Sequence, residues 1–136
     1  MNTHFTVVEA YLRLSQALEI DPAAYGPVLH PEVEQTEYPN LLTKTTQVRS
    51  FEAIIDNVRA GRELLLNPQF ENTTLQSVTP DSVLLETYWH ASVMGNFSLL
   101  QRGTRLAAQM SMIFEFKDNL IFRQRTYRCF ELLAAS

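Results

Sequence analysis

The sequence predicts an α+β fold, in which helices pack on one face of a curved, mostly antiparallel sheet. Residues 106–130 indicate two long strands around a tight turn at residues 117–119, because apolar and polar side chains alternate with a period of two. Residues 50–66 instead place apolar side chains in one stripe at helical spacing. The helices precede most of the strands along the chain, which is typical of α+β domains.

The first half of the chain contains the predicted helices and one short strand. Residues 5–20 carry apolar side chains at helical spacing, and Asp21-Pro22 then begins a second, short helix. Residues 32–37 alternate weakly and predict a short strand, which a loop follows. Ser50 is suited to cap the long helix, and Asn67-Pro68 is expected to end it.

Four consecutive antiparallel strands are expected after the long helix. Residues 70–79 lead through a Pro80-Asp81 turn into residues 83–94, and a longer loop joins these to the final hairpin. One alternate set of residues 83–94 is apolar and is expected to meet the helices: Val83, Leu85, Thr87, Trp89, Ala91 and Val93. The opposite set, with its neighbours on the next strand, indicates a face where a second subunit docks to form a homodimer: Tyr88, His90, Gln109 and Ile113.

The composition limits which classes of protein the chain can belong to. The chain has 136 residues, of which 46% are hydrophobic and 19% charged, so a single globular domain over residues 1–136 is expected. A net charge of −4 argues against broad nucleic-acid binding. No apolar run approaches the roughly 20 residues of a membrane helix, and no signal-peptide pattern begins the chain, so no membrane contact is expected. The single cysteine excludes an intrachain disulfide and favours a cytoplasmic protein.

The spacing of chemical motifs excludes several enzyme classes. The sequence has no Cys-x-x-Cys or His-x-x-x-His pair, no glycine-rich phosphate loop and no Gly-x-Ser-x-Gly. These absences argue against a metalloenzyme, a nucleotide hydrolase and an α/β-hydrolase. No metal and no cofactor are therefore expected.

The last strand predicts a small-molecule pocket. A period of two places Ile121, Arg123, Arg125, Tyr127 and Cys129 on one face, which would aim polar groups into an apolar shell. Tyr127 is then a candidate hydrogen-bond donor, and Arg125 a candidate electrostatic stabiliser, for a carbonyl or developing enolate. The alternative is that Arg125 neutralises a carboxylate and Tyr127 packs in the core with its hydroxyl satisfied.

Glu37 is the candidate general base. If Val33 points inward, Gln35 and Glu37 point inward too, and a desolvated carboxylate beside Tyr38 would have a raised pKa. The alternative is an exposed glutamate at the end of the strand, or one paired with Arg123 or Arg125. Further pocket lining is expected from Gln35, Tyr38, Trp89, Met112, Phe114 and Cys129, and core packing is the alternative for the apolar members of this set.

The order of elements and several segments resemble the nuclear transport factor 2-like superfamily, and within it the SnoaL-like group. The segments are His30–Val33, Gln35–Asn40, Phe114–Ile121 and Arg123–Phe130, and two of them resemble a bacterial branch whose pattern reads Gln-x-Glu-x-Pro-Asn early and Arg-Gln-Arg-Asn-Tyr-Asp-Cys-Phe late. The resemblance implies a cone-shaped fold around a deep central pocket, usually as a homodimer. Superfamily relatives include ketosteroid isomerase, polyketide cyclases and many non-catalytic members, so the fold does not choose between catalysis and binding.

This chain departs from the branch pattern at Arg128, where the branch has an aspartate. Alternation predicts that residue 128 faces the outer surface, away from Tyr127 and Cys129.

Three functions follow as alternatives. The first is a protein that binds a hydrophobic metabolite, either without chemistry or as a cofactor-free isomerase, cyclase or dehydratase in which Tyr127 and Arg125 assist proton transfer by Glu37. The second is a non-catalytic homodimeric binding or scaffold module, with a small cavity and Glu37 paired to Arg125. Whether the chain is an enzyme is left open by the sequence, and a protein-interaction module is a third alternative.

Overall fold

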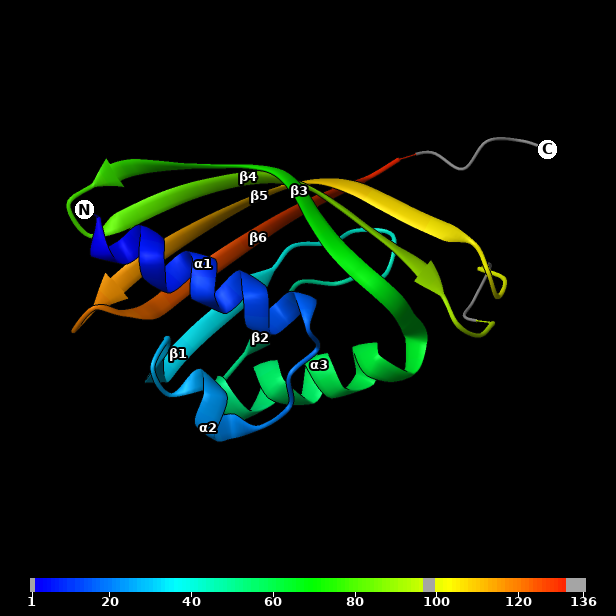
Figure 1. Cartoon of the computed structure of the whole chain (residues 1–136), viewed down its shortest axis with the longest axis horizontal. Coiled ribbons are helices and arrows are strands. Elements are labelled where there is room, and N and C mark those ends of the chain that lie inside the picture. The colour runs from blue at the N-terminus through cyan, green and yellow to red at the C-terminus, as the bar shows by residue number, and fades with distance from the viewer. Residues whose placement is uncertain (1, 97–99, 132–136) are drawn as a thin grey trace.

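The computed structural model describes residues 2–96 and 100–131, which fold into three helices and six strands (Figure 1). The helices are α1 (Thr3–Gln16), α2 (Pro22–Tyr25) and α3 (Phe51–Leu64). The strands are β1 (Leu29–Glu37), β2 (Gln47–Arg49), β3 (Leu65–Thr79), β4 (Ser82–Val93), β5 (Arg105–Lys117) and β6 (Leu120–Phe130). No helix within the described ranges is long and apolar enough to span a membrane.

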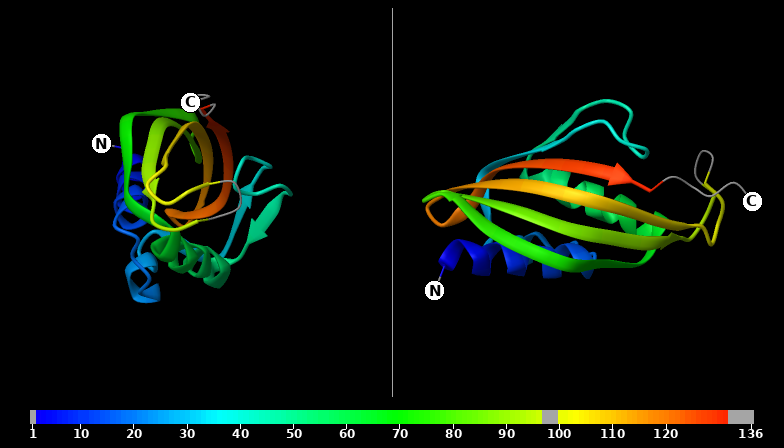
Figure 2. Two further views of the ribbon diagram at one scale, coloured as in Figure 1. Left: turned by 90° about the vertical axis from the view of Figure 1, so that its right-hand side faces the viewer. Right: turned by 90° about the horizontal axis from the view of Figure 1, so that it is seen from above.

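The strands form one sheet in the order β2-β1-β6-β5-β4-β3. All neighbours are antiparallel except β1 and β6, which run parallel. The sheet is strongly curved and unclosed, and α1 and α3 lie on its concave side (Figures 1 and 2). The predicted α+β class, with helices on one face of a curved and mostly antiparallel sheet, is confirmed.

Local sequence signals explain where the main elements begin. The side chains of Asn2, Asp21 and Ser50 accept hydrogen bonds from backbone N–H groups in the first turns of α1, α2 and α3, as expected for residues at helix N-caps. The β5–β6 hairpin turns at Asp118-Asn119, where both residues have a left-handed backbone with φ of 55° and 57°. Aspartate and asparagine tolerate this conformation, and a two-residue turn of this kind matches the twist of the strands.

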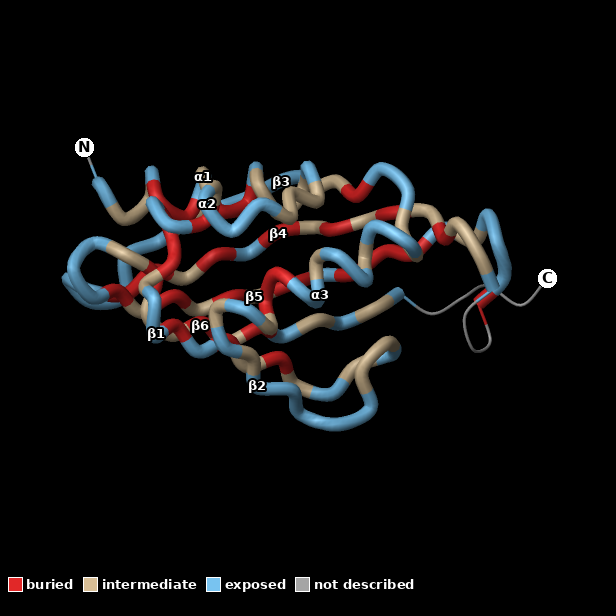
Figure 3. The backbone as a smooth tube through the Cα atoms, turned by 90° about the horizontal axis from the view of Figure 1, so that it is seen from below, coloured by how far each residue is buried: buried red, intermediate tan, exposed pale blue. Residues whose placement is uncertain are grey.

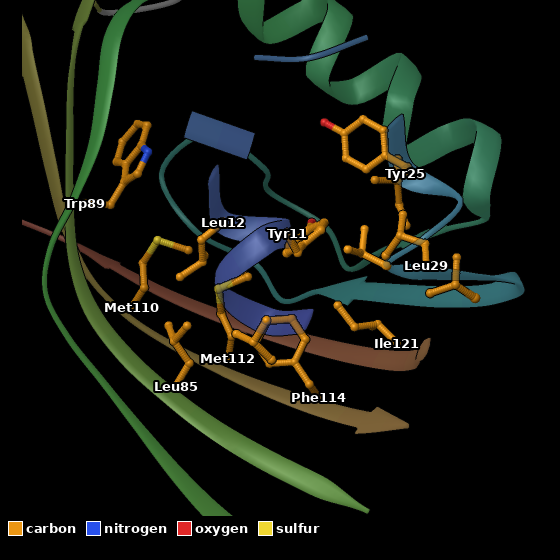
Figure 4. Close-up of a cluster of buried hydrophobic side chains, with 14 of the residues drawn as sticks. Tyr11, Leu12, Tyr25, Leu29, Leu85, Trp89, Met110, Met112, Phe114 and Ile121 are labelled. Atoms are coloured by element: carbon orange, nitrogen blue, oxygen red, sulfur yellow. The ribbon is translucent and has the colours of Figure 1, made fainter. Parts of the chain in front are cut away.

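The core lies between the concave face of the sheet and α1. The inward set of β4 is buried as predicted, and so are Met110, Met112 and Phe114 of β5. Burial alternates along these strands (Figure 3). Figure 4 shows Met112 and Phe114 packed beside Tyr11 and Leu12 of α1, and the rings of Tyr11 and Phe114 meet edge to face at 6.0 Å between centroids.

The end of the long helix and one short strand depart most from the sequence prediction. The helix α3 ends at Leu64, and β3 begins at once, so Asn67-Pro68 lies inside a strand rather than at a helix end. The pairing of β3 with β4 shifts register there, and Asn67 has a φ of 53°, so the helix-breaking pair marks an irregularity within the strand. The strand β2 was not expected, because three residues are too short to give a periodic signal.

The last strand departs from the predicted pattern in a way that matters for the site. Phe116 pairs with Ile121 and Glu115 pairs with Arg123, so Phe122 is an extra residue, a β-bulge. Because the bulge shifts the alternation by one residue, Gln124 and Thr126 are buried. The prediction that Arg123, Arg125, Tyr127 and Cys129 share the inward face with Ile121 is therefore wrong.

Candidate functional site

A pocket of about 460 Å³ lies between α3 and the concave face of the sheet. Its apolar wall includes Leu18, Leu42, Val58, Leu64, Phe70 and Trp89. Its polar side is formed by Glu37 of β1, Arg49 of β2 and Arg128 of β6. A narrow extension of about 60 Å³ shares Glu37 and Arg128 with this pocket and continues inward to Met110 and Met112. This combination of apolar wall and convergent polar groups is typical of a small-molecule site.

Glu37 is the centre of the polar side, and its side chain is only 6% exposed. The β1–β2 register sets Arg49 opposite Gln35, two residues before Glu37 on the same face, and Arg49 Nη1 donates a hydrogen bond to Glu37 Oε1 at 2.9 Å. The amide of Asn40 donates to Oε2 at 2.8 Å. Arg128 Nη1 lies 3.6 Å from Oε2, within ion-pair distance. Three separate segments of the chain therefore converge on one carboxylate.

A buried hydrogen-bond network extends from this cluster across the concave face. Arg49 Nη1 also donates to Gln35 Oε1 at 3.0 Å. Gln35 Nε2 lies 3.0 Å from the hydroxyl of Tyr11 and 3.1 Å from Gln124 Oε1, to both of which it donates. Gln124 Nε2 in turn donates to Thr126 Oγ1 at 3.3 Å. Because the members of such a network are mutually satisfied, the network holds the floor of the pocket in one arrangement.

The electrostatics of Glu37 differ from the sequence prediction. Burial alone would raise the pKa of Glu37, but Arg128, the Asn40 amide and Arg49 outweigh burial and hold the pKa below its ordinary value. The carboxylate is therefore ionised at neutral pH and is a weak base. The expectation of a raised pKa is contradicted, and so is the expected pairing with an arginine at 123 or 125.

Arg128 faces the pocket, although alternation placed it on the outer surface. The β-bulge at Phe122 is the reason, because it turns the even-numbered residues after it inward. The guanidinium carbon of Arg128 lies 5.2 Å from the centre of the Trp89 ring, a cation–π geometry. Its Nε is buried and has no hydrogen-bond partner among the described residues. Burial lowers the pKa of the Arg128 guanidinium, Glu37 raises it and Arg49 lowers it further.

The structure brings four of the predicted residues to the pocket or its inner extension. Glu37 and Trp89 line the pocket, and Gln35 and Met112 line its inner extension. Phe114 is also inward but is fully buried against α1, so core packing, the alternative stated for it, is the better description. Arg49 and Arg128 were missed. Only the strand pairing reveals them, since β2 is very short and β6 contains a bulge.

Four predicted residues lie on the outer face or at its rim. Arg125 Nη1 contacts Glu115 Oε2 at 2.6 Å, and Cys129 is exposed. Tyr127 is 41% exposed and stacks on Tyr38 at 4.7 Å between ring centroids. The expected convergence of Glu37, Arg125 and Tyr127 in the pocket is therefore wrong.

The residues of the predicted docking face do lie together on the convex side. Cross-strand pairing sets Tyr88 of β4 opposite Gln109 of β5, and His90 and Ile113 belong to the same outward sets of these strands. His90 Nε2 lies 3.1 Å from Glu71 Oε1 of β3. No group of three or more histidine, cysteine or acidic side chains that could hold a metal ion occurs in residues 2–96 and 100–131.

Comparison with known proteins identifies the fold. No family model matches the sequence, and no curated protein matches it. Among solved structures, a SnoaL-like polyketide cyclase from Agrobacterium tumefaciens superimposes with a TM-score of 0.71 at 16% identity, over 94% of this chain and 92% of that one. A protein of ketosteroid isomerase-like fold from Catenulispora acidiphila, in complex with trimethylamine, gives 0.68 at 16% identity, over 89% and 83%. A phenazine biosynthesis-related protein from Pseudomonas aeruginosa gives 0.70 at 11% identity, over 93% and 80%.

Proposed function

Since the chain has the nuclear transport factor 2-like fold, we propose that it binds a small organic molecule in the pocket between α3 and the sheet. The observation that carries this proposal is the pocket itself, about 460 Å³ in volume, with an apolar wall on one side and buried polar groups on the other. Its dimensions suit a molecule with an apolar body and one polar end. The fold alone supports no choice between binding and catalysis.

The arrangement of side chains favours binding over proton transfer by Glu37. A general base works best when its pKa is near the working pH, whereas Arg128 and Arg49 hold the pKa of Glu37 below its ordinary value. Tyr127 and Arg125, the expected assistants in proton transfer, lie on the outer face. We therefore propose a binding protein for a hydrophobic metabolite. The isomerase, cyclase or dehydratase chemistry expected of Glu37, Tyr127 and Arg125 together is not part of this proposal.

The single tryptophan of the chain allows a direct test. Trp89 lines the pocket, so its fluorescence reports on the site alone. Phenylbutanamide, a neutral probe with an apolar body, is expected to change the Trp89 emission in a saturable way. A linear change with no saturation would contradict the proposal.

Gly61 offers a variant that blocks the pocket. Gly61 lines the pocket on α3, and a Cβ added there meets Leu18 Cδ2 at 3.9 Å and Leu65 Cδ1 at 4.0 Å, which are ordinary contacts. Gly61→Leu is expected to occupy the cavity and reduce probe affinity at least tenfold. Gly61→Ala is the matched control, because it raises stability by about 1 kcal/mol through helix propensity and leaves most of the cavity open. Equal probe affinity in the two variants would place binding elsewhere.

A further inference from the structure

The polar side of the pocket carries an excess of positive charge. Arg49 and Arg128 both lie within ion-pair distance of Glu37, which is one carboxylate for two guanidinium groups. Glu63 of α3 also lines the pocket but is exposed to solvent, so it neutralises the buried cluster little. A buried charge without a partner is costly, and proteins normally pair it.

The hydrogen bonds show which of the two arginines is incompletely paired. The oxygens of Glu37 already accept short hydrogen bonds from Arg49 and from Asn40, at 2.9 Å and 2.8 Å. Arg128 stands further off, at 3.6 Å, and its buried Nε has no partner among the described residues. A guanidinium has five N–H donors in one plane. Arg128 thus retains donor capacity at the inner end of an apolar pocket.

The planar arrangement of the N–H donors of Arg128 indicates the chemical class of the ligand. A guanidinium binds a carboxylate through two parallel hydrogen bonds, which fix the position of the acid as well as its charge. Trp89 lies against the Arg128 guanidinium, and Phe70 and Val58 line the same pocket. An acid held by Arg128 would therefore place its apolar body along this wall.

From this geometry we infer that the pocket selects an organic carboxylate, whose acid group completes the partners of Arg128 while its apolar body packs against Trp89. The inference rests on the proposed function and names the class of ligand for the same site. It requires no movement of Glu37, since Arg49 and Asn40 keep that side chain in place.

The test compares two probes that differ only at the acid. Phenylbutyrate carries the carboxylate and phenylbutanamide is its neutral counterpart. By isothermal titration calorimetry, the wild-type protein is expected to bind phenylbutyrate at least tenfold more tightly. Arg128→Met is expected to abolish this preference by lowering the affinity for phenylbutyrate at least tenfold. Arg13→Met is the matched control, because it removes the same charge from an exposed position on α1 and is expected to keep the preference.

A second variant guards against a folding defect. Arg128→Met is expected to stay folded, as checked by circular dichroism, because Glu37 keeps the hydrogen bonds from Arg49 and Asn40. Should Arg128→Met unfold, Arg128→Lys retains the charge but loses the two-pronged geometry, and the preference for phenylbutyrate is expected to fall at least threefold.

The outcomes separate this inference from the proposed function. Equal wild-type affinity for the two probes overturns the carboxylate preference and leaves the binding function standing. A preference that persists unchanged in the Arg128 variants also overturns the inference. If neither probe binds, the proposed function fails and the inference fails with it.

Discussion

Glu37 connects segments that are distant in the sequence. Its carboxylate accepts hydrogen bonds from Arg49 and Asn40 and attracts Arg128, so β2, the loop before β2 and β6 all meet at one side chain. The fold stabilises the ionised form, which is why the pKa lies below the ordinary value of 4.5. A carboxylate of this kind stabilises the folded state fully above pH 4.5, and this stabilisation is lost as the pH falls through the lowered pKa.

Glu37→Gln is therefore expected to destabilise the protein at neutral pH, by about 3 kcal/mol, because two partly buried arginines lose the carboxylate with which they both pair. The difference from wild type is expected to shrink as the pH falls below 4.5. Urea denaturation across a pH series measures both effects. Glu34→Gln, an exposed glutamate on the same strand, is the control and should change little. A loss of stability that stays constant with pH would contradict the assigned role of the Glu37 charge.

At the scale of one element, the inward face could be predicted from the sequence for some strands and not for others. In β4, one alternate set is apolar throughout and the other mixed, so the inward face follows from the hydrophobic effect and is confirmed by burial. In β6, both alternate sets contain polar side chains, so hydrophobicity does not show which set points inward. One set is Gln124, Thr126 and Arg128, and the other is Arg125, Tyr127 and Cys129. The choice depends on the bulge at Phe122, which exists only through pairing with β5.

The candidate site was less predictable than the fold for this reason. Glu37 and Trp89 were recognisable because burial alternates regularly over residues 33–37 of β1 and 83–93 of β4. Arg128 was misplaced by one extra residue in its strand, and Arg49 belongs to a strand of three residues that forms only against β1. The positions of both arginines depend on contacts between segments far apart in the chain. The local sequence pattern carries no information about such contacts.

The facing of β6 can be checked by thiol chemistry. Cys129 is exposed on the outer face, so it is expected to react with a thiol-specific reagent in the native protein almost as fast as in the unfolded protein. In a Cys129→Ser background, Thr126→Cys places the only thiol at a position that is 3% exposed, and its reaction should be at least a hundredfold slower. A thiol at position 126 that reacts faster than Cys129 would mean that β6 faces the other way.

At the scale of the whole molecule, the helices of the described ranges lie on the concave side of the sheet (Figure 2). On the convex side, β4 and β5 carry Tyr88, His90 and Ile113, which are half-buried within one chain. We expect this face to bind a second copy of the chain, sheet against sheet. Such an interface leaves the pocket, on the opposite side, open to a ligand.

Ile113→Glu is expected to convert a dimer to a monomer, because it places a charge on the docking face. Sedimentation velocity at several protein concentrations measures the change. Val78→Glu is the control, since Val78 is 60% exposed on β3 and the same substitution there should leave assembly unaffected. A wild-type protein that sediments as a monomer at every concentration would exclude the homodimer.

The parallel pairing of β1 with β6 has a consequence for biosynthesis. On the ribosome, Gln35 and Glu37 emerge early, but β1 and β2 gain their place in the sheet only after β6 has been made. While the β3–β5 meander is translated, the Glu37 carboxylate therefore lacks Arg128 and the Gln35 amide lacks Gln124, their partners on β6. Contacts of such high sequence separation form slowly. The ligand pocket is thus the last part of the protein to assemble, and a carboxylate ligand that binds it would favour completion of folding.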